Sequence, residues 1–155
     1  TTQLNKIIFL KKLGIEPLKK IFNVEYFEKF IKNRKKNIKN LLMDQTFVSG
    51  LGNIYANEAL FMSKIKPLRI CKSLNKNEMK NLIFNIKKIL KFSISKGGSS
   101  VRDFQNTLGK SGNFQQFFHV YGQKNKNCSR ISCKGKIKKI TISNRSSFYC
   151  NRCQI

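Results

Sequence analysis

The sequence predicts an α+β chain in which a mainly helical domain is followed by a small β-hairpin that holds one zinc ion through four cysteines. Two observations support this prediction. Apolar residues recur at helical spacing from Met79 to Leu90 and form one stripe, which is typical of a helix packed on a core. Near the end of the chain, four cysteines follow the spacing Cys128-x4-Cys133-x16-Cys150-x2-Cys153, with strand-like residues between the two pairs.

The chain is strongly basic. Its 155 residues include 32 Lys and Arg against 7 Asp and Glu, which gives a formal net charge of +25. Such an excess predicts a polyanionic partner, most often nucleic acid, because each neutralised phosphate releases condensed counterions. Lys, Asn and Ile are abundant throughout the chain, however, so charge alone does not choose a substrate. No run of 18 apolar residues is present, which predicts a cytoplasmic protein without a membrane span.

Three segments are expected along the chain. Residues 1–17 contain L-G-I-E-P and are expected to form a hinge, residues 18–116 the helical domain, and residues 117–155 the zinc hairpin. Within the helical domain, a helix is predicted just before a basic run that includes Arg34, Lys35 and Lys39. A charge run of this kind is either a solvated face or a phosphate-binding surface, and the residues alone leave both open.

A glycine-bearing turn, V-S-G-L-G-N, leads into an apolar helix that we expect to run towards Pro67. Gly50 and Gly52 are expected to adopt positive φ and to let a ligand approach the backbone, and Asn53 stands where the helix begins. The N-terminus of a helix attracts phosphate through its unpaired N–H groups and its dipole. The same turn is also typical of a plain connection between helices, so the pattern leaves a phosphate site and a simple connection open.

The following segments carry weaker signals. Asn75 and Glu78 predict a capping box at the start of the helix that bears the apolar stripe, which we expect to serve as scaffold. The segment L-G-K-S-G-N-F predicts a surface loop around Lys110. His119 lies in an aromatic run without a cysteine or carboxylate beside it in sequence, and it is interpreted as a packed or half-exposed side chain. Cys71 is isolated in sequence and is expected to be a small half-buried side chain.

The cysteine cluster predicts a structural zinc site. Four thiolates satisfy a tetrahedral zinc ion completely and leave no position for a catalytic water, and the binding energy is expected to fold the hairpin. The strands are expected at residues 136–143 and 146–149, which places Arg145 at the turn. A turn arginine is either solvated or able to bind phosphate in a bidentate manner. Disulfides or unrelated thiols are the alternatives for the cysteines, and the absence of a secretory signal argues against disulfides.

Two stretches carry a family resemblance. Leu41 to Phe61, L-L-M-D-Q-T-F-V-S-G-L-G-N-I-Y-A-N-E-A-L-F, resembles the helix-two-turn-helix segment of bacterial formamidopyrimidine-DNA glycosylases. Arg145 to Gln154, R-S-S-F-Y-C-N-R-C-Q, resembles the zinc finger of the same enzymes. One departure is the first cysteine pair, which is separated by four residues where two are commoner in the family. The resemblance covers nearly the whole chain, in the family's order.

The resemblance implies a role in DNA binding for five residues. Arg34 and Lys35 lie in a basic cluster similar to the one that holds DNA phosphates in the family. Asn53 corresponds to the phosphate contact at the helix N-terminus, and Lys110 lies in the segment that matches the loop near the extruded base. Arg145 matches the arginine that inserts towards the phosphates at the lesion and is linked to the second elimination step, so it is also the candidate catalytic residue.

These matches imply the DNA-binding C-terminal half of a bifunctional DNA glycosylase and AP lyase, which excises oxidised purines such as 8-oxoguanine and formamidopyrimidine in base excision repair. In the family the nucleophile belongs to an N-terminal domain that begins Pro-Glu, whereas this chain begins Thr-Thr. Asp44 and Glu58 are expected to pair with cations or to support helix ends, so the acidic residues form no recognisable acid/base pair.

Three expectations follow from this difference. Thr1 is not expected to be the natural start, residues 1–17 are expected to include the end of the missing catalytic domain, and the chain alone is expected to be inactive. The implied partner is double-stranded damaged DNA, bound by a monomer at the bacterial nucleoid.

Two alternatives remain open at this point. The sister glycosylase for oxidised pyrimidines shares the layout, although F-Y-C-N-R-C-Q and V-Y-G-Q resemble the purine enzyme more closely. The second alternative is a non-catalytic zinc-dependent nucleic-acid-binding module. Such a module would bind abasic and undamaged duplexes equally, because its affinity would come from phosphate contacts alone.

Overall fold

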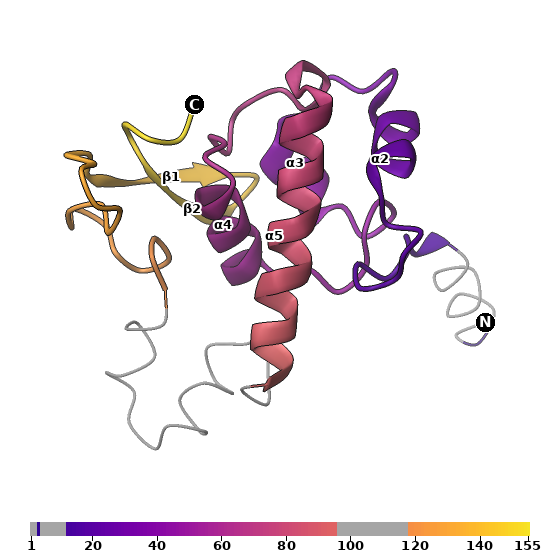
Figure 1. Cartoon of the computed structure of the whole chain (residues 1–155). Coiled ribbons are helices and arrows are strands. Elements are labelled where there is room, and N and C mark those ends of the chain that lie inside the picture. The colour runs from indigo at the N-terminus through magenta and orange to yellow at the C-terminus, as the bar shows by residue number, and fades with distance from the viewer. Residues whose placement is uncertain (1–2, 4–11, 96–117) are drawn as a thin grey trace.

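A computed structural model describes residue 3 and residues 12–95 and 118–155 of the chain (Figure 1). The described elements confirm the predicted α+β class, because helices come first and a four-cysteine antiparallel hairpin comes last. The loop around Lys110 and the boundary at residues 116–117 lie outside the described residues. The elements are α2 (Val24–Ile31), α3 (Ile38–Met43), α4 (Asn53–Met62), the 3₁₀ turn η1 (Cys71–Ser73), α5 (Lys76–Ser95), β1 (Ile137–Ile142) and β2 (Arg145–Cys150).

Asparagine side chains begin the two short helices α2 and α3. The Oδ1 atom of Asn23 accepts a hydrogen bond from the Tyr26 backbone N–H at 2.9 Å, and that of Asn37 accepts one from the Asn40 N–H at 2.8 Å. Such caps satisfy N–H groups that have no partner within the helix. The six residues of α3 are too few for a stable isolated helix, so burial of side chains such as Leu41 must stabilise it.

α4 is the central helix of the described structure. Its residues from Ile54 to Phe61 are all buried, which is typical of a helix with neighbours on every side. α5 packs against α4 on one side and β2 packs against it on another, so α4 lies between α5 and the hairpin (Figure 1). At the end of α4, Phe61 joins Val120, Ile137 and Phe148 in the small core of the hairpin. The helical core and the hairpin core are therefore connected through one helix.

Both ends of α4 differ from the prediction. Gly50 has the expected positive φ of 80°, but Gly52 is extended, with φ −82° and ψ 169°. The positive φ predicted for Gly52 was wrong, because the residue that caps a helix at its N-terminus takes an extended backbone. At the other end, α4 stops at Met62 and does not continue towards Pro67, since the chain enters the left-handed region at Lys64 with φ 60°.

α5 confirms the longest predicted helix. The expected capping box is present: the Glu78 N–H donates to Asn75 Oδ1 at 2.8 Å, and the Asn75 N–H donates to Glu78 Oε1 at 3.1 Å. The Glu78 carboxylate also accepts hydrogen bonds from both terminal nitrogens of the Arg69 guanidinium. Like the other helices in the described part of the chain, α5 is too short or too polar to cross a membrane.

β1 and β2 form a hairpin with a two-residue turn. Ile142 pairs with Arg145, and the two residues between them, Ser143 and Asn144, have φ values of 49° and 64°. Two successive positive φ values are what a type I′ turn requires, and this turn matches the natural twist of paired strands. Arg145 therefore lies at the turn, as predicted, and begins β2.

Candidate nucleic-acid interface and metal centre

The four cysteines predicted to bind a metal come together at the base of the hairpin. The Sγ atoms of Cys128, Cys133, Cys150 and Cys153 all lie within 4.8 Å of one another. The Cys128–Cys153 and Cys133–Cys150 sulfur pairs are separated by 3.8 and 3.7 Å, far more than the roughly 2.05 Å of a disulfide bond. Four thiolates bound to a tetrahedral ion with metal–sulfur bonds of about 2.3 Å would lie about 3.8 Å apart. The four cysteines thus fit one tetrahedral metal ion.

The four-residue loop between Cys128 and Cys133 still lets both sulfurs join the four-cysteine cluster. The Nη1 of Arg130, from this loop, donates a hydrogen bond to the Cys153 sulfur at 2.9 Å, and the guanidinium lies 4.0 Å from the centre of the Phe61 ring. A cation in this position offsets part of the negative charge of the thiolates. Gly135 makes room on the other side, because a Cβ atom there would lie only 2.5 Å from the Cys150 sulfur.

The N-terminus of α4 is open at the point where a phosphate is expected. Gly52 is the N-cap of α4 and has no side chain to accept hydrogen bonds from the first turn. A Cβ atom built on Gly52 would meet no heavy atom of the described residues within 4 Å. Its extended backbone also suits any residue, so nothing in the described structure requires glycine there. The open space in front of the first turn is the kind of space that an incoming phosphate needs.

Asn53 connects this helix terminus to the hairpin turn. Its Nδ2 donates a hydrogen bond to the backbone oxygen of Ser146 at 3.1 Å, and Ser146 directly follows Arg145. The Arg145 side chain is exposed and forms no hydrogen bond or ion pair with any residue that the structure describes. The fold therefore brings together Asn53 and Arg145, two residues predicted to bind DNA from distant parts of the sequence.

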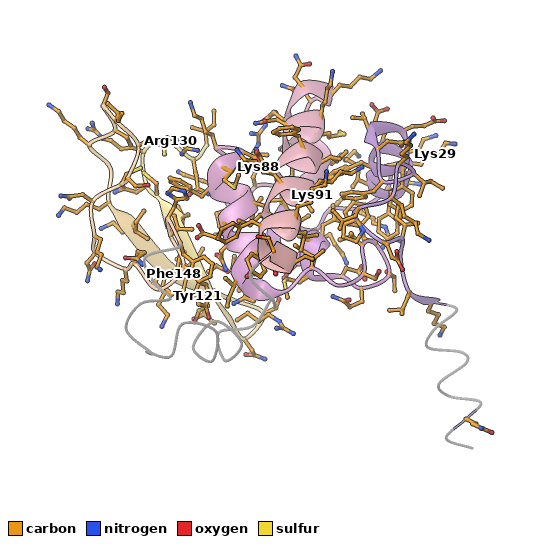
Figure 2. All side chains as sticks on the ribbon, turned by 60° about the horizontal axis from the view of Figure 1, so that its bottom comes forward. Lys29, Lys88, Lys91, Tyr121, Arg130 and Phe148 are labelled. Atoms are coloured by element: carbon orange, nitrogen blue, oxygen red, sulfur yellow. The ribbon has the colours of Figure 1, made fainter. Side chains whose placement is uncertain are left out.

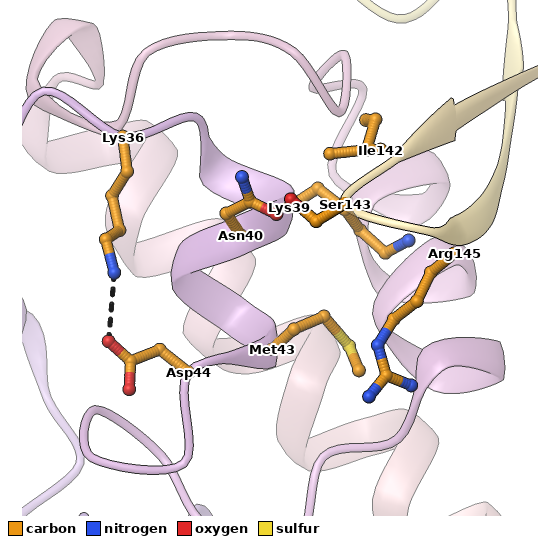
Figure 3. A pocket seen from close by; sticks show the side chains of 8 residues that line it. All are labelled: Lys36, Lys39, Asn40, Met43, Asp44, Ile142, Ser143 and Arg145. Atoms are coloured by element: carbon orange, nitrogen blue, oxygen red, sulfur yellow. Dashed lines mark hydrogen bonds and ion pairs between the residues drawn. The ribbon is translucent and has the colours of Figure 1, made fainter.

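A cleft of about 340 Å³ lies beside Arg145, between α3 and the hairpin turn (Figure 3). In it, the Lys36 ammonium pairs with the Asp44 carboxylate at 3.0 Å, as expected for Asp44. No other ion pair links the lining residues, so the charges of Lys39 and Arg145 are not neutralised by a carboxylate within the cleft. The cleft is lined by Lys36, Lys39, Asn40, Met43, Asp44, Ile142, Ser143 and Arg145.

Lys39 shows that the basic run is not one surface. Its side chain is only 1% exposed, and its Nζ donates to Ser147 Oγ at 2.7 Å. Burial, and secondarily repulsion by the Arg145 charge, lowers the pKa of Lys39 to about 8. An anion bound beside Arg145 would favour the charged form of Lys39 and raise this pKa again. Sequence reasoning named Lys39 only as a member of the basic run and did not expect its burial. The one signal for burial is that Lys39 is the only charged residue in the α3 segment I-K-N-L-L-M.

Arg34 and Lys35 are exposed but do not line the cleft. The Arg34 Nε donates to the backbone oxygen of Phe30 at 3.0 Å, and the guanidinium lies 4.1 Å from the centre of the Phe30 ring. Arg34 is thus held against the end of α2, and the structure does not bring it to Arg145. The DNA-binding role of both residues stays a prediction, and Lys110 lies outside the described residues.

Positive charge in the described part of the chain is not confined to the neighbourhood of Arg145. Lys29 lies on α2, and Lys88 and Lys91 lie on α5 (Figure 2). Arg130 lies beside the Cys153 sulfur. This spread agrees with the interpretation that net charge alone does not locate a binding site. What distinguishes the neighbourhood of Arg145 is the combination of a cleft, a buried lysine and an open helix N-terminus.

Glu58 is buried and connects α4 to the segment that precedes the hairpin. Its carboxylate accepts backbone N–H bonds from His119, Val120 and Tyr121 at 2.6, 3.0 and 2.9 Å. The expectation that Glu58 pairs with a cation or supports a helix end was wrong, because three successive N–H groups form an anion-binding concavity around it. Burial raises the pKa of Glu58, and the three hydrogen bonds oppose that rise. The His119 ring stacks on the Phe61 ring but remains exposed to solvent, which agrees with its interpretation as a packed or half-exposed side chain.

Comparisons with known proteins agree with this geometry. Residues 13–105 match the family model of the formamidopyrimidine-DNA glycosylase H2TH domain. The formamidopyrimidine-DNA glycosylase of Pelotomaculum thermopropionicum is 42% identical over 154 residues, which cover 99% of this chain and 55% of the relative. The chain spans about half the length of the curated relatives it matches.

Two solved complexes of the Lactococcus lactis Fpg are similar in structure to this chain. The complex with DNA that contains an abasic site has a TM-score of 0.80 and 35% identity, and the match covers 100% of this chain and 55% of that chain. The complex with DNA that contains Fapy-dG has a TM-score of 0.81 and 34% identity, and covers 99% of this chain and 55% of that chain.

Proposed function

The chain belongs to the formamidopyrimidine-DNA glycosylase family, and from this premise we propose that it is the DNA-binding half of a bifunctional DNA glycosylase and AP lyase. Its proposed substrate is double-stranded DNA that carries an oxidised purine, 8-oxoguanine or formamidopyrimidine. The shared name of the relatives and the complex of the Lactococcus lactis protein with Fapy-dG DNA support this lesion class, and the complex with abasic-site DNA supports binding to DNA that lacks a base. The chain acts as a monomer in this proposal, on the DNA of the bacterial nucleoid.

The described residues would bind the phosphates on either side of an extruded nucleotide. Extrusion is necessary because the reacting sugar carbon is inaccessible while the base remains stacked in the duplex. The N-terminus of α4 offers N–H groups and a helix dipole to one phosphate, with Asn53 beside it. Arg145 offers a planar guanidinium to another phosphate. The observation that carries the proposal is the hydrogen bond from Asn53, at this open helix terminus, to the backbone of Ser146, which directly follows the exposed Arg145.

Arg145 is also the proposed catalytic residue of the chain. Its cation would stabilise the negative charge on the phosphate that departs in the elimination step. Lys39 lies in the same cleft and adds a second positive charge when it is protonated. We place the nucleophile in the part of the longer relatives that this chain does not match, so the chain alone is proposed to bind without cutting.

Zinc is the proposed metal of the four-cysteine centre. Four thiolates in tetrahedral geometry are typical of structural zinc, and such a site has no open position for water or substrate. Cys128, Cys133, Cys150 and Cys153 would hold the ion as thiolates, and its binding would contribute to the folding of the hairpin. The zinc is thus proposed to stabilise the element that carries Arg145, without a direct part in the reaction.

Equilibrium binding tests the proposal. Fluorescence anisotropy would compare a duplex that contains a tetrahydrofuran abasic-site analogue with the undamaged duplex, at one fixed salt concentration. Arg145→Ala should weaken binding to the abasic duplex about tenfold or more, because a charge-assisted contact is worth about 1.5–3 kcal/mol. The matched control is Arg152→Ala, which removes the same charge from an exposed residue next to the metal centre. Equal binding of both duplexes by the wild-type chain would instead favour a general nucleic-acid-binding module.

A further inference from the structure

The outer edge of β2 is covered by a side chain of α4. β1 pairs with one edge of β2, and the backbone carbonyl of Ser146 and the N–H of Phe148 both point from the other edge towards α4. The side-chain amide of Asn57 lies opposite these two groups. Its Oδ1 accepts the Phe148 N–H at 2.8 Å, and its Nδ2 lies 3.4 Å from the Ser146 oxygen. One amide thus takes the place that the peptide group of a neighbouring strand would occupy.

The same amide group is bonded to the start of α4. The Nδ2 of Asn57 donates to the backbone oxygen of Asn53 at 2.8 Å, one helical turn earlier. Asn53 in turn donates its own Nδ2 to the Ser146 oxygen at 3.1 Å. Asn57 is fully buried, so these hydrogen bonds are shielded from water. The result is a closed set of contacts between the first turn of α4 and the residue that follows Arg145.

We propose that Asn57 is the positioning residue that sets the spacing between Asn53 and Arg145, the two phosphate contacts of the proposed function on which this inference rests. A two-stranded hairpin is only marginally rigid by itself, and binding groups act well only when they are held within about 0.5 Å of their productive positions. The fixed contact at Ser146 and Phe148 supplies that restraint immediately beside Arg145.

An amide is the side-chain group that this position requires. It must donate towards the Asn53 and Ser146 oxygens and accept from the Phe148 N–H at the same time. Asn57→Ala removes both functions. Asn57→Asp keeps the size and the acceptor but turns a carboxylate oxygen towards two carbonyl oxygens, so it loses the donor without leaving a cavity.

The test measures binding of the zinc-loaded 155-residue chain to the tetrahydrofuran-containing duplex. Asn57→Ala and Asn57→Asp should each weaken binding about tenfold while zinc content and the far-UV circular dichroism spectrum stay unchanged. The matched control is Asn85→Ala, which removes another buried asparagine, bonded to Ser63 Oγ at 2.9 Å within the helical core. This control should change the affinity less than twofold.

A double-mutant cycle with Arg145 separates positioning from general destabilisation. If Asn57 acts through Arg145, then Asn57→Ala should cost less than twofold in the Arg145→Ala background, because the contact that it positions is already absent. A full tenfold cost in that background, or no cost of either Asn57 variant in the wild type, would overturn the inference and leave the proposed function intact. If the wild-type chain shows no preference for the abasic duplex and Arg145→Ala changes nothing, the proposed function itself fails and this inference fails with it.

Discussion

The buried ammonium group of Lys39 should make the free energy of unfolding depend on pH, and this dependence can be measured directly. The side chain is 1% exposed, and its pKa is lowered from 10.5 to about 8, first by burial and then by the charge of Arg145. Below pH 8 the group is protonated in both the folded and the unfolded chain, so the penalty for burying its charge is constant. Above pH 8 the unfolded chain binds more protons at this site than the folded chain does. The free energy of unfolding must therefore rise with pH in that range.

The pKa values set the size of this effect. Between pH 7 and pH 9.5, a folded pKa of about 8 and an unfolded pKa of 10.5 predict a rise of about 2 kcal/mol in the free energy of unfolding. Lys39→Met has a similar length and no titrating group, so it should lack this rise. Arg145→Ala should show a smaller rise than the wild type, because removal of the neighbouring charge returns part of the Lys39 pKa towards its usual value.

Urea unfolding followed by far-UV circular dichroism at several pH values from 7 to 9.5 would measure the effect, with zinc bound at every pH. Cysteine and tyrosine titrations are shared by the wild type and Lys39→Met, so they cancel in the difference between the two proteins. The reasoning would be refuted if the two stability curves ran parallel across this range. That result would mean that the Lys39 ammonium group keeps its hydration in the folded chain.

Three further predictions concern the metal centre and the contact between α4 and the hairpin. Gly135→Ala places a Cβ atom 2.5 Å from the Cys150 sulfur and should weaken zinc binding about tenfold or more, measured by competition with a chromophoric chelator. The control Gly52→Ala adds a Cβ atom that contacts no other atom of the described residues and should leave zinc binding unchanged. Zinc removal with EDTA should abolish the dispersed amide NMR signals of residues 118–155 and leave those of the helical domain in place. Dispersed hairpin signals in the metal-free chain would contradict the prediction that the metal folds the hairpin. Glu58→Gln turns an amide group towards the three N–H donors and should lower the free energy of unfolding in urea by about 2–4 kcal/mol. A loss below about 0.5 kcal/mol would show that the Glu58 carboxylate does not stabilise these three N–H groups.

Elements with local signals were predictable from the sequence. The α5 helix has its capping box and its apolar stripe within a short stretch, and both act through neighbours on the same helix. The metal centre was equally accessible, because thiolates at this spacing have few other uses in a chain without disulfides. Arg145 was placed at the hairpin turn because the strand residues on either side of it limit where the chain can reverse.

Contacts between distant segments were not predictable from the residues. Lys39 is bonded to Ser147, 108 positions away, and nothing near Lys39 in sequence reveals that the hairpin covers it. Glu58 and Asn57 likewise find their partners more than 60 positions later, where α4 packs against the hairpin and the segment before it. These contacts depend on the way two segments distant in sequence pack together, and local patterns contain no information about that packing.

The position of Arg145 depends on two restraints that act at opposite ends of β2. The metal centre holds β2 at Cys150, about 17 Å along the strand from Arg145, and a two-stranded hairpin does not transmit rigidity reliably over that length. Asn57 supplies the second restraint, beside Arg145, through the backbone of Ser146 and Phe148. Loss of zinc and loss of Asn57 should therefore weaken the binding of abasic DNA by different routes. The first would unfold the hairpin, whereas the second would leave the hairpin and its metal intact and release only the end that meets the phosphate.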